Sequence, residues 1–317
     1  MSPGTATDVA PEQEQSKPAC SGWWREVLYA VGFVAVSGVV RLAGSRLGSA
    51  PQLVPAGMNG QAWTRRPRLH WWREVLYAAG FYAVYSAIRN TQGSATVSAA
   101  HAFNNARHVI RLESVLGLYH EQALHQAFLG NRLFISFWNL FYGSFHFIVT
   151  VFALVWLFRK FPARYPRWRN TLAITTGLAL VGFALYPLMP PRLLPGNYGY
   201  VDTLRTYGAL WSFDSGTMSK ISNQYAAMPS LHFAWATWCA LVLVPALESM
   251  WAKVLAALYP VFTLFAIVVT ANHFVLDAVG GLVVLGVGGV AGFALAAWVE
   301  RRQQPPQLQP RRVAVGR

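Results

Sequence analysis

The chain has 317 residues, of which 54% are hydrophobic and only 12% are charged. A soluble globular domain carries about 25% charged residues, so this composition indicates an integral membrane protein. The net charge of +14 comes from short basic blocks between apolar stretches, a pattern that favours a role in membrane topology and argues against a nucleic-acid partner.

Residues 1–22 contain acidic side chains and no apolar run, so we expect a disordered leader and no cleaved signal peptide. Two copies of one motif follow: WWREVLYAVGFVAV at 23–36 and WWREVLYAAGFYAV at 71–84 match at twelve of fourteen positions. A repeat that builds a fold needs at least three copies, so we interpret this one as a local duplication. The first copy belongs to a hydrophobic segment, 23–48, that forms either an extra helix or an interfacial one, and 49–70 is a linker.

A membrane-spanning helix needs about 20 mostly apolar residues. Six segments meet or approach this length and predict an all-α, six-helix membrane domain over residues 71–299. We expect these helices near 71–89, 133–158, 171–189, 231–247, 252–272 and 275–299.

Three basic blocks lie before the first of these helices, after the second and after the last. They comprise Arg65, Arg66, Arg68 and Arg73; Arg159, Lys160, Arg164, Arg167 and Arg169; and Arg301, Arg302, Arg311, Arg312 and Arg317. With six helices all three blocks fall on one side, which the positive-inside rule assigns to the cytoplasm. We therefore expect a protein of the cell membrane with a disordered, basic, cytoplasmic tail at 300–317.

The loop from 100 to 128 is expected on the external side. Its apolar residues recur at helical spacing among histidine, arginine and glutamate, which predicts a helix lying on the membrane surface. Such a helix forms either a lid or substrate entrance, or simply a packed interfacial element.

Arg192 follows Pro190 and Pro191 where the third helix reaches the external face. A guanidinium group binds phosphate through two parallel hydrogen bonds, so Arg192 is a candidate phosphate ligand. The alternative is an interfacial arginine that binds lipid headgroups.

The tetrapeptide Pro229-Ser230-Leu231-His232 opens the fourth helix. Proline and serine are common at a helix start, so the motif has an ordinary structural explanation. Free amides at a helix N-terminus also bind phosphate, and a histidine one turn in can protonate a leaving oxygen. Ser230 is therefore a candidate phosphate ligand and His232 a candidate general acid.

His273 and Asp277 are four residues apart, so on a helix they share one face. A carboxylate bonded to one ring nitrogen fixes the tautomer and makes the other nitrogen a better nucleophile. Stabilisation of the last helix by its dipole is the alternative role for Asp277. All the candidates from Arg192 onward fall at the external ends of predicted helices.

No catalytic role is assigned to the other polar residues. Tyr142 and His146 of the second helix are interpreted as packing groups, with lining of the cavity as the alternative. No spacing of histidines and the two cysteines suits a metal site. The remaining residues are expected to bind a headgroup or to bond within loops: Arg89, Glu113, His120, Glu121, Asn223, Gln224 and Asn272.

Residues 71–299 resemble the type-two phosphatidic acid phosphatase superfamily, which includes lipid phosphate phosphatases, inositolphosphotransferase-like enzymes and vanadium haloperoxidases. The resemblance implies six helices, with His273 as the nucleophile that forms a phosphohistidine and Asp277 as its orienting group. It also implies that His232 is the general acid, that Arg192 and Ser230 hold the phosphate, and that no metal or other cofactor takes part.

Three positions depart from the family pattern. Leu231 replaces a glycine, Leu185 stands where the first motif has a lysine, and Ile267 stands where the third motif has an arginine. Arg89 and Arg205 are candidates to replace the missing cations. Pro-Ser-Leu-His resembles the inositolphosphotransferase-like branch more than the plain phosphatases.

The sequence therefore predicts an enzyme that acts on a lipid phosphate or phosphodiester at the external face, with membrane lipids as its surroundings. The alternative reaction is transfer of an inositolphosphoryl headgroup to a lipid alcohol. An inactive scaffold or lipid transporter is the alternative of another class, but it would have no reason to keep His232, His273 and Asp277. Lipid identity, acceptor and oligomeric state are left open.

Overall fold

The computed structural model describes residues 69–91, 98–207 and 224–303. The predicted leader, the first repeat copy, most of the linker and the end of the basic tail lie outside the described residues.

Helices occupy all six segments in which the sequence predicts them. They are α2 (Trp71–Thr91), α5 (Arg132–Lys160), α6 (Tyr165–Leu185), α9 (Leu231–Leu243), α10 (Met250–Val269) and α11 (Val275–Gln303). Three are long and apolar enough to cross a membrane: Arg132–Lys160, Met250–Val269 and Val275–Arg302. The prediction of an all-helical membrane protein is thus confirmed for the described residues, whereas six complete spans stay a prediction.

Prolines explain why the boundaries of α6 and α9 differ from those predicted. α6 begins at Tyr165 because Pro166 lies in its first turn, where proline is well tolerated. It ends at Leu185 because Pro187 disfavours a helical conformation at Tyr186. α9 has 13 residues, a length of about 20 Å, and the chain leaves it before Pro245.

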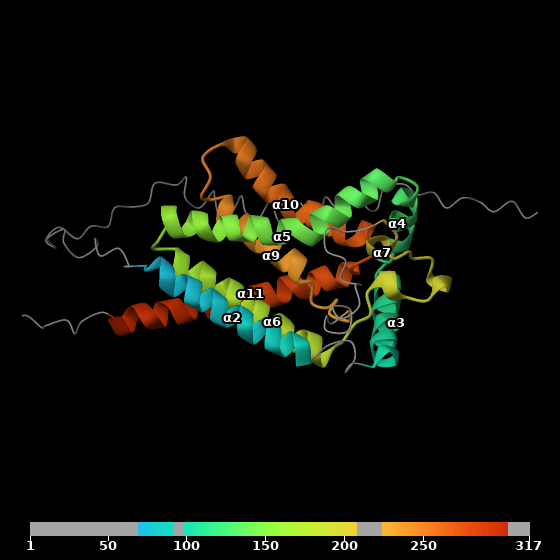
Figure 1. Ribbon diagram of the computed structural model, residues 1–317, viewed down its shortest axis with the longest axis horizontal. Coiled ribbons are helices and arrows are strands. Elements are labelled where there is room, and N and C mark those ends of the chain that lie inside the picture. The colour runs from blue at the N-terminus through green and yellow to red at the C-terminus, as the bar shows by residue number, and fades with distance from the viewer. Residues whose placement is uncertain (1–68, 92–97, 208–223, 304–317) are drawn as a thin grey trace, which may run out of the picture.

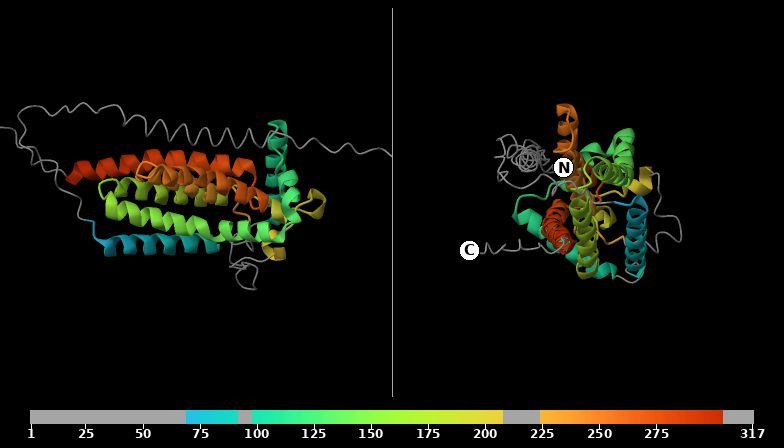
Figure 2. Two further views of the ribbon diagram at one scale, coloured as in Figure 1. Left: turned by 90° about the horizontal axis from the view of Figure 1, so that it is seen from above. Right: turned by 90° about the vertical axis from the view of Figure 1, so that its left-hand side faces the viewer.

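The helices α2, α5, α6 and α11 run side by side along the long axis of the molecule, and α3 (Ala99–Val115) lies across one end of them (Figures 1 and 2). α4 (Glu121–Leu129), α7 (Thr203–Tyr207) and the short 3-10 turns η1 (Pro191–Leu193) and η2 (Gly196–Tyr198) lie at the same end. Gly117 adopts a left-handed conformation (φ 68°) between α3 and α4. The single surface helix predicted for 100–128 is therefore wrong, because this turn divides it in two.

Basic residues gather at the opposite end of the bundle, where α2 and α6 begin and α5 and α11 end (Figure 1). Two ion pairs tie these helices together: Arg169 to Glu74 at 2.7 Å and Arg167 to Glu300 at 3.1 Å. The basic blocks within the described residues thus lie far from the starts of α9 and α11, where the candidate site is found. That the basic end faces the cytoplasm stays a prediction.

α6 and α11 run antiparallel with their backbones in close contact. A Cβ atom added to Gly288 would lie 2.9 Å from the Thr175 amide nitrogen, and one added to Gly292 would lie 2.5 Å from that of Thr171. Small residues spaced by four allow such close approach of membrane helices. The two glycines therefore set the distance between α6 and α11.

Replacement of Gly288 by alanine is expected to lower the free energy of unfolding by about 1–3 kcal/mol, because the new methyl group overpacks the contact with Thr175. Gly286 is the matched control, since nothing lies within 4 Å of the Cβ that Gly286→Ala would add. The measurement is the thermal unfolding midpoint of each variant in one detergent. Equal midpoints for the two variants would contradict this account of the packing.

Candidate active site

His273 and Asp277 are in contact at the start of α11. His273 Nδ1 lies 3.2 Å from Asp277 Oδ2, which also accepts the Phe274 N–H at 2.9 Å. Both side chains are buried, with His273 4% and Asp277 0% exposed. One carboxylate oxygen of Asp277 therefore contacts the His273 ring and caps the start of α11 at once.

The turn that carries His273 is held by the end of α10. The amides of Asn272 and His273 both donate to the Ile267 carbonyl, at 2.9 and 3.1 Å. Ala271 has a φ of 55°, a left-handed conformation that is uncommon for any residue with a side chain. His273 thus lies before α11 and not on it, and a tight turn, not a shared helical face, brings it to Asp277.

His232 lies in the first turn of α9, next to this turn. Its ring centroid is 5.5 Å from that of His273, and the two rings meet edge to face. Ser230 caps α9, because its side chain accepts the Phe233 N–H at 3.4 Å, and its own N–H donates to the Asp277 carbonyl at 2.8 Å. The structure therefore brings four of the five predicted residues together.

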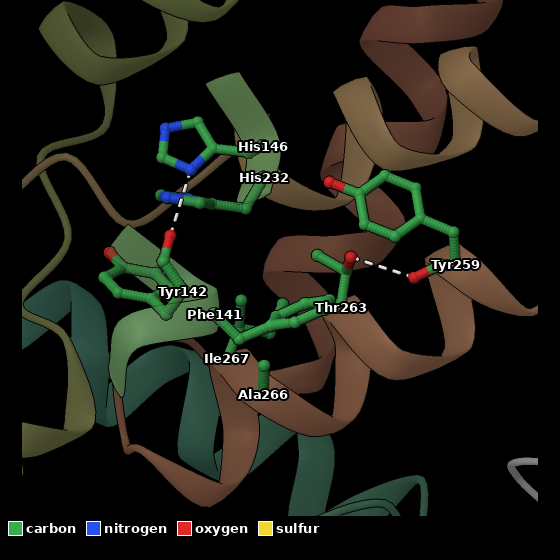
Figure 3. A pocket seen from close by; sticks show the side chains of 8 residues that line it. All are labelled: Phe141, Tyr142, His146, His232, Tyr259, Thr263, Ala266 and Ile267. Atoms are coloured by element: carbon green, nitrogen blue, oxygen red, sulfur yellow. Dashed lines mark hydrogen bonds between the residues drawn. The ribbon is translucent and has the colours of Figure 1, made fainter. Parts of the chain in front are cut away.

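Two residues of α5 enclose His232, although the sequence favoured a packing role for them over a place in the cavity. The Tyr142 ring stacks on the His232 ring, with 4.2 Å between the ring centroids (Figure 3). The His146 ring meets the His232 ring edge to face, with 4.4 Å between the centroids. His146 Nδ1 lies 2.9 Å from the Tyr142 carbonyl and donates to it, which leaves Nε2 free of a proton when the ring is neutral. The available signal was a tyrosine and a histidine four apart in an otherwise apolar helix.

A narrow gap, too small to hold a water molecule, adjoins His232 between α5, α9 and α10 (Figure 3). Tyr142, His146 and His232 supply its polar side chains together with Tyr259 and Thr263, and the rest of its lining is apolar. His232 is the predicted site residue that reaches it.

Arg192 lies on η1 and is connected to the same turn. Its backbone N–H donates to the Ala271 carbonyl at 2.8 Å, and its Nη1 forms an ion pair with Asp202 at 2.7 Å. Its Nε is buried with no hydrogen-bond partner among the described residues. Asp202, which the sequence did not single out, therefore holds the guanidinium and leaves the Nε donor unused.

The two positions at which the family pattern has a cation differ in exposure, and the structure describes the side chain of one of the two arginines considered as replacements. Leu185 is 76% exposed, whereas Ile267 is fully buried beneath the His273 turn. Arg205 is exposed, and its backbone N–H bonds to Asp202 at 3.3 Å. The Arg89 side chain lies outside the described residues. In the described part of the chain no group of three or more metal-binding side chains is placed to hold an ion.

Comparison with known proteins identifies the family. A family model described as "PAP2 superfamily" matches residues 107–291, more than half of the chain and a range that includes every predicted site residue. Searches of curated proteins and of solved structures found no significant match. The chain belongs to the PAP2 superfamily, the group of type-two phosphatidic acid phosphatases, whose members generally hydrolyse phosphate esters. Together with the three apolar helices, this membership indicates a membrane protein with a phosphatase-type function.

Asp277→Asn is expected to reduce hydrolysis of a phosphate ester by about 100-fold or more, because the neutral amide no longer fixes and stabilises the His273 ring. The asparagine oxygen still accepts the Phe274 N–H, so the variant should remain folded. Turnover and the unfolding midpoint are measured in detergent beside Glu300→Gln, which removes a carboxylate at the opposite end of the bundle. Unchanged turnover in Asp277→Asn would rule out the orienting role.

Proposed function

We propose that this protein is a membrane-embedded phosphatase or phosphotransferase that acts on a lipid phosphate or phosphodiester through a phosphohistidine. The observation that carries the proposal is the buried His273–Asp277 contact of 3.2 Å with the His232 ring 5.5 Å away. A nucleophile, its orienting carboxylate and a second histidine in one place form the arrangement that nucleophilic catalysis requires.

In the first step His273 attacks the substrate phosphorus. Because Nδ1 donates its proton to Asp277 Oδ2, the lone pair of Nε2 forms the new N–P bond as the bond from phosphorus to the leaving oxygen breaks. His232, protonated at this stage, gives its proton to that oxygen. The products are a phosphohistidine and a lipid alcohol.

In the second step an acceptor hydroxyl attacks the phosphohistidine. His232, now neutral, takes the proton of a water molecule or alcohol as its oxygen bonds to phosphorus and the N–P bond breaks. Water gives a phosphatase, and a lipid alcohol gives a phosphotransferase. The same two residues serve both outcomes, so the acceptor depends on what reaches the site.

Arg192 and the start of α9 are the proposed phosphate ligands. The Nε of Arg192 has a donor to spare, and the first amides of a helix have no acceptor within the helix. Ser230 holds this helix start in place through its bond to Asp277. With leucine and isoleucine at the family's cationic positions, main-chain amides carry a larger share of phosphate binding.

The second candidate function is inositolphosphoryl transfer to a lipid alcohol, which rests on Leu231 in the tetrapeptide. Leu231 packs against Ala179, Leu180 and Phe183 of the described core. A glycine could not make this contact, so the leucine distinguishes the helix start from that of the plain phosphatases. An inactive scaffold or lipid transporter is the candidate of another class.

The site is proposed to act at the external face of the cell membrane, with the C-terminal tail in the cytoplasm. The separation of the basic end from the histidine end supports this orientation.

A labelling experiment tests the function. Purified protein in detergent is incubated with ³²P-labelled lipid phosphates and phosphodiesters, with and without inositol or diacylglycerol. We expect a protein-bound label that is stable to alkali and lost in acid, and His273→Ala should lower turnover by about 1000-fold or more. His108→Ala is the control, because His108 is an exposed histidine of α3.

The labelled products of this experiment distinguish the candidate functions. Labelled inorganic phosphate alone indicates a phosphatase. Labelled phosphatidic acid formed from added diacylglycerol indicates a phosphotransferase, and a labelled inositol phosphate ester of the lipid indicates the second candidate. Label retained in His273→Ala would contradict the proposed nucleophile. Neither label nor turnover with any substrate would favour the scaffold or transporter.

If His232 is the general acid, the loss of rate in a His232 variant should depend on the leaving group of the substrate. His232→Ala should reduce hydrolysis of an alkyl phosphate by about 100-fold or more, because an alkoxide cannot leave without a proton. Hydrolysis of p-nitrophenyl phosphate should fall far less, since nitrophenolate is a stable anion. Rates for both substrates are compared in wild type and variant, and an equal loss for both would exclude a general-acid role.

A further inference from the structure

Two buried carboxyl groups from outside the long helices meet the start of α11. Glu113 of α3 accepts the Leu276 N–H at 2.7 Å, and Glu121 of α4 accepts the Val275 N–H at 3.1 Å. Glu113 is 0% and Glu121 1% exposed. Because Asp277 accepts the Phe274 N–H, three consecutive amides each donate to a different carboxyl group.

Three ionised carboxylates in one buried place would be strongly unfavourable. A helix N-terminus stabilises one nearby negative charge by about 0.3–2 kcal/mol, far less than the cost of burying several. The second oxygen of Glu113 and that of Glu121 are both buried without a hydrogen-bond partner among the described residues. One proton held between the two carboxyl groups would give both oxygens a partner and remove one charge.

The electrostatic surroundings agree with this account. Burial, and next the charge of Glu121, raises the pKa of Glu113 to about 10, with a further contribution from Asp277. Burial also raises the pKa of Glu121. At neutral pH the pair therefore keeps a proton. Tyr119 and Tyr200, whose hydroxyls are 3.3 Å apart, adjoin the pair and are themselves uncharged at this pH.

We propose that Glu113 and Glu121 form a proton-sharing acid pair that positions the nucleophile, by fixing the first turn of α11 on which Asp277 holds His273. This inference rests on the proposed function. The pair touches neither the His273 ring nor the proposed phosphate ligands in any contact found among the described residues, so both glutamates are positioning residues. They act on the rate of the chemical step through the main chain.

Replacements of Glu113 separate shape from charge. Glutamine has the shape of a protonated glutamate: its oxygen can accept the Leu276 N–H and its NH₂ group can donate to Glu121. Glu113→Gln should therefore keep kcat within about threefold of wild type. Glu113→Leu removes both bonds, and a displacement of the nucleophile by about 1 Å can lower kcat by about 100-fold with little change in KM. Arg111→Leu, on an exposed position of α3, is the control.

A spectroscopic measurement tests the shared proton without relying on activity. A protonated buried carboxyl group gives an infrared C=O stretching band that shifts in D₂O, and this band should be present at neutral pH in wild type and absent in Glu113→Gln. Its absence in wild type would overturn the acid pair. If wild type lacks turnover but shows the band, the proposed function fails while the acid pair stands.

Kinetics then test positioning. Rescue of kcat by glutamine but not by leucine, in variants that elute as folded protein, supports the proposal. Full kcat in folded Glu113→Leu would overturn it. A rise in KM alone, with kcat unchanged, would overturn it as well, because that result would place the pair in substrate binding.

Discussion

A single backbone hydrogen bond, from the Ser230 N–H to the Asp277 carbonyl at 2.8 Å, joins the two helix starts that carry the site. Ser230 caps α9, which carries His232, and Asp277 lies in the first turn of α11 and contacts His273. The close approach depends on Gly281, because a Cβ there would lie 2.5 Å from the Ser230 carbonyl oxygen. The distance between the two histidines therefore follows from how closely two backbones can pack.

The polar groups of the site are satisfied mostly by one another. Burial of an unpaired polar group in an apolar bundle costs several kcal/mol, so each donor needs an acceptor nearby. The amides of Phe274, Val275 and Leu276 find theirs in three carboxyl groups, and Arg192 finds Asp202. Among the described residues of the site, one oxygen of each of these three carboxyl groups and the Nε of Arg192 stay without a hydrogen-bond partner.

The sequence was informative where function and fold are encoded locally. Apolar length located every long helix, and His232, His273, Asp277 and Ser230 were identified from spacing and helix-start chemistry. It was uninformative about partners brought together from distant segments: Glu113 meets Leu276 across 163 residues, and Tyr142 stacks on His232 from another helix. A glutamate in an amphipathic loop has the same local pattern whether it faces water or caps a distant helix.

The position of α3 has a consequence for how a substrate arrives. α3 lies across the histidine end of the bundle, and its Glu113 is bonded to the first turn of α11 (Figure 1). If α3 lifted away as a lid, the Leu276 amide would lose its acceptor and Glu121 would lose the partner of its buried oxygen. The same movement would loosen the turn that holds His273. Admission of a substrate past α3 and readiness for chemistry are thus mechanically opposed, so an approach sideways from the bilayer, between the long helices, is the route that leaves the nucleophile in place.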